Sequence, residues 1–146
     1  MKCNVLIIIV LFIFSKTSLA EGCQQPKSLN KSQLLFMMNE MYIPSNPNAG
    51  GIQQVNFTEK NLTATELRKG ITSQGAYQYR IIASGVALVE AQLIEGDDRA
   101  IFRMILMCKN NFSGKYIFSQ SQGVMKPDRR QNTGDYIIEP AILLLN

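Results

Sequence analysis

Few residues of this chain are equipped for catalysis, because the sequence contains no histidine. That absence excludes Ser-His-Asp and Cys-His catalytic arrangements and histidine zinc sites. The chain also has no tryptophan and no glycine-rich phosphate-binding motif. An enzyme built on this sequence would depend on carboxylates, tyrosines or lysines, and we do not expect the protein to be an enzyme.

The acids of most interest lie in the second half of the chain. Glu90 falls in a segment with strand-like alternation, where Arg80 or Arg103 could lie across from it. We interpret this arrangement as a cross-strand ion pair. Asp97 and Asp98 are adjacent in a predicted turn, a place where aspartates commonly serve the turn itself. A carboxylate-dependent hydrolase acting outside the cytoplasm, with these acids and an arginine, is therefore the alternative function.

The first 20 residues have the pattern of a cleaved signal peptide. Lys2 precedes the apolar run Val5–Phe14, and Ser18 and Ala20 form a small-x-small cleavage site. The run is too short to span a bilayer as a helix, which takes about 20 apolar residues. We expect residues 1–20 to be removed and the protein to be secreted or periplasmic, without a stable membrane anchor.

Removal of this segment lowers the net charge. The remaining 13 basic and 11 acidic residues give +2, whereas the full chain carries +4. A charge of +2 without a concentrated basic patch does not predict nucleic-acid binding. The 126 residues 21–146 suffice for one compact domain.

Two cysteines, Cys23 and Cys108, remain after cleavage. An even number of cysteines in an exported chain favours a disulfide. Closing a loop of this length would stabilise the fold by about 4–5 kcal/mol in the chain-entropy treatment. A lipid-anchored Cys23 is the alternative, but Glu21 does not fit the cleavage motif of a lipoprotein, and Cys108 would be left unpaired.

Four Asn-x-Ser/Thr motifs follow the cleavage site, at Asn30, Asn56, Asn61 and Asn111. In a eukaryotic secretory route they would mark surface positions. In a bacterial periplasm they would carry no such meaning, and the sequence does not name its host.

Hydrophobic spacing predicts a helix over residues 29–42 and a strand over residues 52–57. The helix prediction rests on the spacing of Leu34, Leu35, Met38, Met41 and Tyr42. Capping-box spacing at Thr63–Glu66 predicts one or two helical turns over residues 64–69.

Two-residue alternation then predicts strands. Ala87, Val89, Ala91 and Leu93 form one apolar face, and Ala100, Phe102, Met104, Leu106 and Cys108 form another. Shorter apolar segments start at Tyr77, Tyr116, Tyr136 and Ala141, and residues 124–134 read as a polar loop. The predicted fold class is α+β, with an N-terminal helix packed on an antiparallel meander of four to five strands and one disulfide.

The methionine pairs Met38-x-x-Met41 and Met104-x-x-Met107 have a spacing that copper(I) sites use. On a helix or in a strand the same residues serve as core filling, which is the interpretation we favour. We therefore expect no metal and no cofactor.

The leading functional hypothesis is an exported, non-catalytic binding or interaction domain. A cavity between the predicted helix and sheet could be lined by Tyr77, Tyr79, Tyr116 and Phe118, which combine apolar rings with polar tips. The partner would be a small apolar ligand or another protein.

Overall fold

Eight strands follow one another along the chain in the computed structural model, which describes residues 22–95, 97–123 and 127–139. The expected signal peptide, residues 1–20, and the apolar segment 141–145 lie outside the described residues. The strands are β1 (Gln33–Met38), β2 (Ile52–Phe57), β3 (Asn61–Glu66), β4 (Ile71–Ala83), β5 (Val86–Glu95), β6 (Asp98–Asn110), β7 (Ser113–Gln122) and β8 (Arg130–Glu139).

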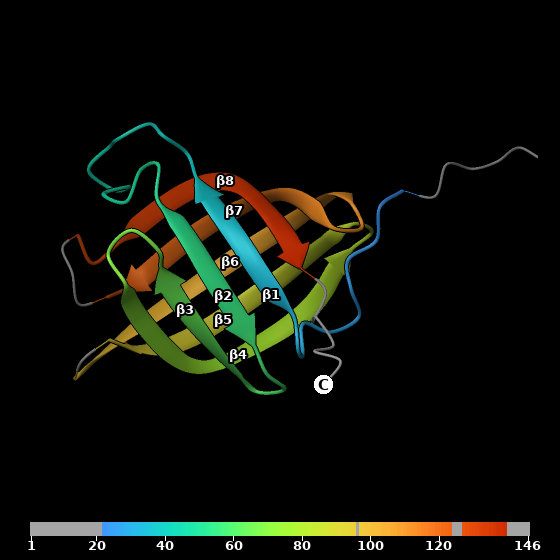
Figure 1. Ribbon diagram of the computed structural model, residues 1–146, viewed down its shortest axis with the longest axis horizontal. Helices are drawn as coiled ribbons and strands as arrows, with labels where there is room; N and C mark the ends of the chain where they lie inside the picture. Colours follow the sequence, from blue (N-terminus) through green and yellow to red (C-terminus); the bar gives the residue numbers. More distant parts are fainter. Residues whose placement is uncertain (1–21, 96, 124–126, 140–146) are drawn as a thin grey trace, which may run out of the picture.

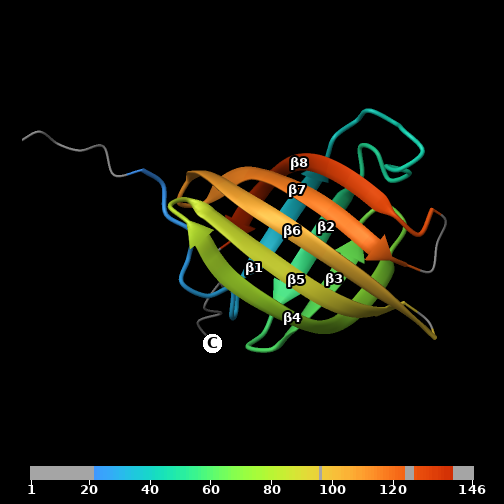
Figure 2. The ribbon, with the colours of Figure 1, turned by 180° about the vertical axis from the view of Figure 1, so that it is seen from behind.

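Every strand pairs antiparallel with its neighbours in sequence, and β1 also pairs with β8, so the sheet closes into a barrel (Figures 1 and 2). The expected α+β class is therefore wrong, because the fold is an all-β barrel and the described residues contain no α-helix. Closure leaves the sheet without an exposed edge. No segment in the described ranges is a helix of the length and apolar character that crossing a membrane requires.

The segment predicted to be the N-terminal helix instead contains β1. Leu34 and Phe36 are buried in the barrel, whereas Met37 on the other face is 46% exposed. The strand pairs on both sides, with β2 and with β8, so closure of the barrel depends on it. Met41 and Tyr42, which seemed to complete a helical stripe, are exposed in the β1–β2 loop.

Two further predicted segments, residues 64–69 and 124–134, also contribute to strands. The predicted helical turns over residues 64–69 are the end of β3 and a turn, and Leu62 and Ala64 of β3 point into the core. The predicted polar loop over residues 124–134 includes the first half of β8. Arg130 is buried there, although it is charged.

The alternation in β5 and β6 is confirmed. The four predicted apolar positions of β5 are at most 3% exposed. In β6, the four apolar positions before Cys108 are at most 7% exposed, and Leu106 is fully buried. Arg103, on the opposite face, is exposed. These strands form one wall of the core.

Two glycines let tyrosine rings cross neighbouring strands. A Cβ atom on Gly134 would lie 2.8 Å from the ring of Tyr116 and 1.9 Å from the backbone oxygen of Met37. A Cβ atom on Gly114 would lie 2.7 Å from the ring of Tyr136. All three contacts are closer than a methyl group allows, so glycine at these positions makes room for the two rings in the barrel interior.

One end of the barrel, which carries the β2–β3, β4–β5 and β6–β7 turns, is closed by the N-terminal segment. Leu29 is fully buried. The Gln25 side-chain amide donates hydrogen bonds to the Leu106 backbone oxygen at 3.0 Å and the Tyr136 hydroxyl at 2.9 Å. We call this the closed end, and the opposite end the mouth.

The predicted Cys23–Cys108 disulfide is confirmed, and its two half-cystines are separated by 85 positions in the sequence. The bond joins the irregular N-terminal segment to β6. It holds that segment across the closed end.

Candidate functional site

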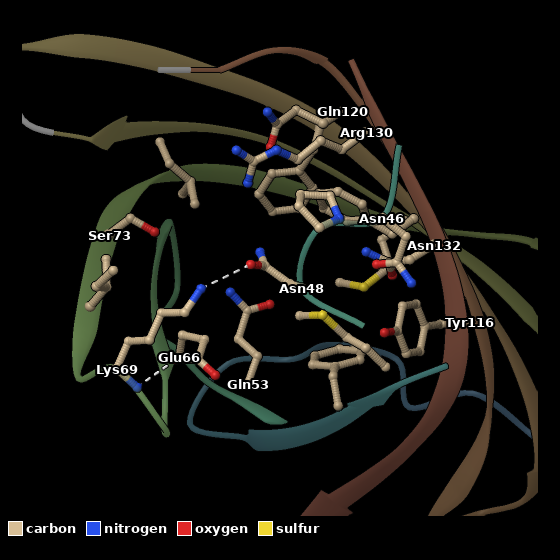
Figure 3. Close-up of a pocket in the computed structure, with 18 residues that line it drawn as sticks. Asn46, Asn48, Gln53, Glu66, Lys69, Ser73, Tyr116, Gln120, Arg130 and Asn132 are labelled. Carbon is tan, nitrogen blue, oxygen red and sulfur yellow. Dashed lines mark hydrogen bonds between the residues drawn. The ribbon is translucent and has the colours of Figure 1, made fainter. Parts of the chain in front are cut away.

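The barrel interior contains a cavity of about 90 Å³ next to the mouth (Figure 3). All eight strands contribute to its lining, together with the β1–β2 loop and Lys69 of the β3–β4 turn. The side chains of the lining divide into an apolar floor and a polar wall.

The floor is built from aromatic and sulfur-containing side chains that the strand alternation turns inward. Phe102 and Phe118 lie with ring centroids 5.2 Å apart. Phe36 meets the ring of Tyr116 edge-on at 5.1 Å. Met104 is buried beside them and also lines the cavity. Such a floor offers an apolar or aromatic group a preformed contact surface.

Unpartnered polar atoms gather at this cavity. Among the residues that the structure describes, four buried side-chain polar atoms have no hydrogen-bond partner. Three of them, Asn46 Oδ1, Tyr116 OH and Asn132 Oδ1, belong to residues that line the cavity. Figure 3 shows these three side chains on the same side of the cavity. Buried polar groups are normally paired, so this concentration is a feature to explain.

The β1–β2 loop covers part of the mouth and carries one of these residues inward. Asn46 is only 3% exposed, and its amide nitrogen donates to the backbone oxygen of Met41 at 3.2 Å. The backbone NH of Gln131 donates to the Ser45 oxygen, which ties the loop to β8. Lys69 Nζ donates to Asn48 Oδ1 at 3.3 Å, which ties it to the β3–β4 turn.

Charged side chains at the cavity already have partners. Glu66 accepts a hydrogen bond from the backbone NH of Lys69 at 2.6 Å. The Arg130 guanidinium donates to the Pro127 backbone oxygen at 3.2 Å. No group of three or more carboxylates or cysteines within the described ranges could hold a metal ion. The buried polar atoms of the lining that lack a partner thus belong to neutral amide and hydroxyl groups.

Burial raises the pKa of the Tyr116 hydroxyl well above its usual value, and the nearby Asp135 carboxylate raises it further. The hydroxyl therefore stays protonated at any physiological pH. A protonated phenol without a partner can donate one hydrogen bond and accept others. The cavity wall consequently offers one donor at Tyr116 and acceptors at Asn46 and Asn132.

The structure brings together two of the four aromatic residues predicted to bind a ligand. Tyr116 and Phe118 line the cavity. Tyr77 and Tyr79 also turn toward the core, but they lie nearer the closed end and do not line it. The Tyr79 hydroxyl donates to the Pro26 backbone oxygen at 2.6 Å. Burial raises the pKa of Tyr79 to about 12, with a smaller electrostatic effect of Tyr136 in the same direction. A binding role for Tyr116 and Phe118 stays a prediction.

The acids considered for catalysis do not converge. Glu90 lies on the outer face of the barrel and pairs with Arg103 at 2.8 Å and with Arg80 at 3.8 Å, as the cross-strand interpretation predicted. Asp98 is opposite Glu95, five residues farther along β5. At about 3.4 Å per residue, Asp98 therefore lies roughly 17 Å from Glu90 along the sheet, too far for the two carboxylates to act on the same bond of a substrate.

Several residues of the cavity were not predicted from the sequence. Phe36 and Met38 belong to β1 and continue the inward alternation from Leu34, a pattern that is visible in the sequence. Met41, the presumed core partner of Met38, is 70% exposed. Asn46 and Asn132 gave no such signal, because isolated asparagines are typical of loops.

Comparison of the chain with protein families, with curated proteins and with solved structures finds no significant match.

Proposed function

We propose that the protein is an exported, non-catalytic binding protein that takes a small ligand into the barrel through the mouth. The observation that carries this proposal is the concentration of unpartnered buried polar atoms beside the apolar floor of the cavity. Small-molecule sites typically combine an apolar lining with a few placed polar groups. Export is supported by the signal-peptide pattern and by a disulfide of the kind that persists in oxidising compartments.

The polar wall matches a neutral hydroxyl group best. A hydroxyl donates one hydrogen bond, which Asn132 Oδ1 or Asn46 Oδ1 can accept, and it accepts a bond from the Tyr116 hydroxyl. A carboxylate could only accept, so it would leave both asparagine oxygens unpaired, and an ammonium could only donate, so it would leave the Tyr116 phenol proton without an acceptor. Either would also have to leave water as a charged group, which is costly unless the charge is paired in the cavity.

The floor selects the body of the ligand. An aromatic or compact aliphatic group can contact Phe36, Phe102, Met104 and Phe118. Apolar cavities of roughly 150 Å³ bind benzene, so the present volume of about 90 Å³ calls for an outward shift of residues 46–48. That segment is held by few hydrogen bonds to the rest of the barrel. A one-ring alcohol combines both features in one small probe.

The proposal is tested with four probes that share a phenyl ring and differ in their polar group: toluene, benzyl alcohol, benzylamine and benzoate. Binding is followed by the rise in Tm, since a ligand that binds only the folded state stabilises it by mass action. Benzyl alcohol is expected to raise Tm most. The absence of binding by every probe would refute a ligand site for small aromatic molecules in this cavity.

The Tyr116→Phe variant tests the polar wall itself. It removes the hydroxyl and keeps the ring that packs on Phe36. Loss of one hydrogen bond of about 0.5–1.5 kcal/mol should weaken benzyl alcohol about two- to tenfold and leave toluene unchanged. Tyr77→Phe is the matched control, because its hydroxyl bonds to the Thr58 backbone oxygen away from the cavity. Equal effects of the two variants would contradict the assigned role of Tyr116.

A further inference from the structure

All four Asn-x-Ser/Thr motifs of residues 22–139 lie at the same end of the barrel. Asn30 precedes β1, Asn56 is the penultimate residue of β2, Asn61 begins β3, and Asn111 lies in the β6–β7 turn. In an up-and-down barrel these positions share one end, which here is the closed end (Figure 1). They come from four separate places along the sequence, so only the fold brings them together.

The four asparagines are also all exposed. Asn56 is in a strand, where the neighbouring residues Val55 and Phe57 are buried and Asn56 faces outward. Across the sheet it stands between Gln33 and Thr63. A large hydrated glycan has to remain outside a folded core, and each of these positions meets that requirement.

Other asparagines show that this placement does not simply follow the distribution of asparagine. Asn39, Asn46 and Asn48 lie in the β1–β2 loop at the mouth, and Asn132 lines the cavity in β8. None of the four is followed two residues later by serine or threonine. Asparagine is therefore present around the cavity, whereas the acceptor motif is confined to the opposite end.

We propose that Asn30, Asn56, Asn61 and Asn111 are N-glycosylated during export, and that their glycans form a collar around the closed end. In this reaction the asparagine amide nitrogen attacks the anomeric carbon of an oligosaccharide carried on a lipid diphosphate. A carbon–nitrogen bond forms, the bond from that carbon to the diphosphate oxygen breaks, and the nitrogen loses one proton. The lipid diphosphate leaves, and no group is oxidised or reduced.

This arrangement gives the two ends of the barrel different surfaces. The collar would cover the end where the N-terminal segment and the disulfide lie, and it would leave the β1–β2 loop and the cavity open to solvent. The inference concerns modification alone, and it holds whether or not the cavity binds a ligand.

The test is to express the full chain, with its own residues 1–20, in eukaryotic secretory cells. The secreted protein is treated with a peptide-N-glycosidase, which converts each glycosylated asparagine to aspartate, and the sites are mapped by peptide mass spectrometry. We expect conversion at the four asparagines of the closed end. Asn56→Gln should lose one site and retain the other three.

Met41→Thr supplies the control, because it completes a fifth acceptor motif at the exposed Asn39 near the mouth. This variant should gain a glycan at Asn39 in addition to the native four. A secreted variant glycosylated only at Asn39 would overturn the proposal, since the cells would then have modified this chain and passed over its own motifs. Retention of the unmodified chain inside the cells would overturn it as well, because the proposal requires export.

Discussion

Replacing Asn132 by leucine is expected to stabilise the free protein and to weaken the binding of a hydroxyl-bearing ligand. Asn132 points into the cavity from β8, and its Oδ1 is buried without a hydrogen-bond partner. Leucine has a similar size and no polar atom. The substitution therefore removes an unsatisfied acceptor and adds apolar surface next to Phe118, its cross-strand neighbour.

The size of the effect follows from the burial of that oxygen. An unsatisfied buried polar group costs about 1–3 kcal/mol. Because the whole Asn132 side chain is only partly buried, we expect a gain in the lower half of this range, about 1–2 kcal/mol. For a domain of this length each kcal/mol shifts Tm by roughly 3–4 °C. Benzyl alcohol should bind less tightly, about two- to tenfold, through loss of one hydrogen bond.

The assay is urea unfolding of unglycosylated protein, followed by the benzyl alcohol titration described above. Asn56→Leu is the matched control, because it makes the same substitution in a strand at an exposed position, so any change in strand propensity is shared. Its free energy of unfolding should change by less than about 0.5 kcal/mol. If Asn132→Leu destabilises the protein, the Asn132 oxygen is not an unsatisfied group and the argument for a polar ligand head fails.

Three further outcomes are expected. Leu106→Ala, which empties a fully buried position, should lower the free energy of unfolding by about 2–5 kcal/mol in a denaturant titration. Arg103→Ala on the outer face should lower it by no more than about 1 kcal/mol, through loss of its ion pair. Equal losses would show that the register of β6 is wrong. Replacing Cys23 and Cys108 together by serine should lower the free energy of unfolding by about 4–5 kcal/mol, and a loss under about 1 kcal/mol would show that the bond does not constrain the unfolded chain. Because the pKa of Tyr79 is raised from 10.0 to about 12, the protonated hydroxyl contributes to the stability of the fold below pH 10, and this contribution is lost as the pH rises through 12. In alkaline unfolding followed by circular dichroism, Tyr79→Phe should therefore lose less stability than the unsubstituted protein between pH 10 and 12.

The sequence predicted correctly those strands whose inner face is wholly apolar. In β6, buried apolar residues alternate with exposed or partly exposed ones, and a period of two has no other simple interpretation. The period was ambiguous in β1, where Leu34, Leu35 and Met38 satisfy a helical spacing as well as they fit a strand. Pairing with β8 decides that ambiguity, and this pairing joins segments about 100 residues apart, which local patterns do not reveal.

The cavity was harder to predict than the core, because on its wall polar side chains face the barrel interior, where apolar ones are expected. Along β8, Arg130 and Asn132 face inward, although polar inward residues look like loop residues in sequence. Tyr116 and Phe118 were found because aromatic residues two apart indicate a strand face. Asn46 reaches the cavity through the course of a long loop, and nothing in its sequence neighbours indicates that burial.

The order of strands around the barrel determines which strand pairs can form first during synthesis of the chain. Each of the contacts β1–β2 through β7–β8 joins consecutive strands, so hairpins can form one after another as the chain is synthesised. The β1–β8 seam has to wait until residues 130–139 have been made. Until then β1 presents an unpaired edge, the kind of surface that recruits strands from other molecules. Cys108 precedes β8, so oxidation to the disulfide can already fasten the N-terminal segment to β6 while the seam is still open. The nascent chain would thus be held near its final shape during the interval in which aggregation competes most strongly with folding.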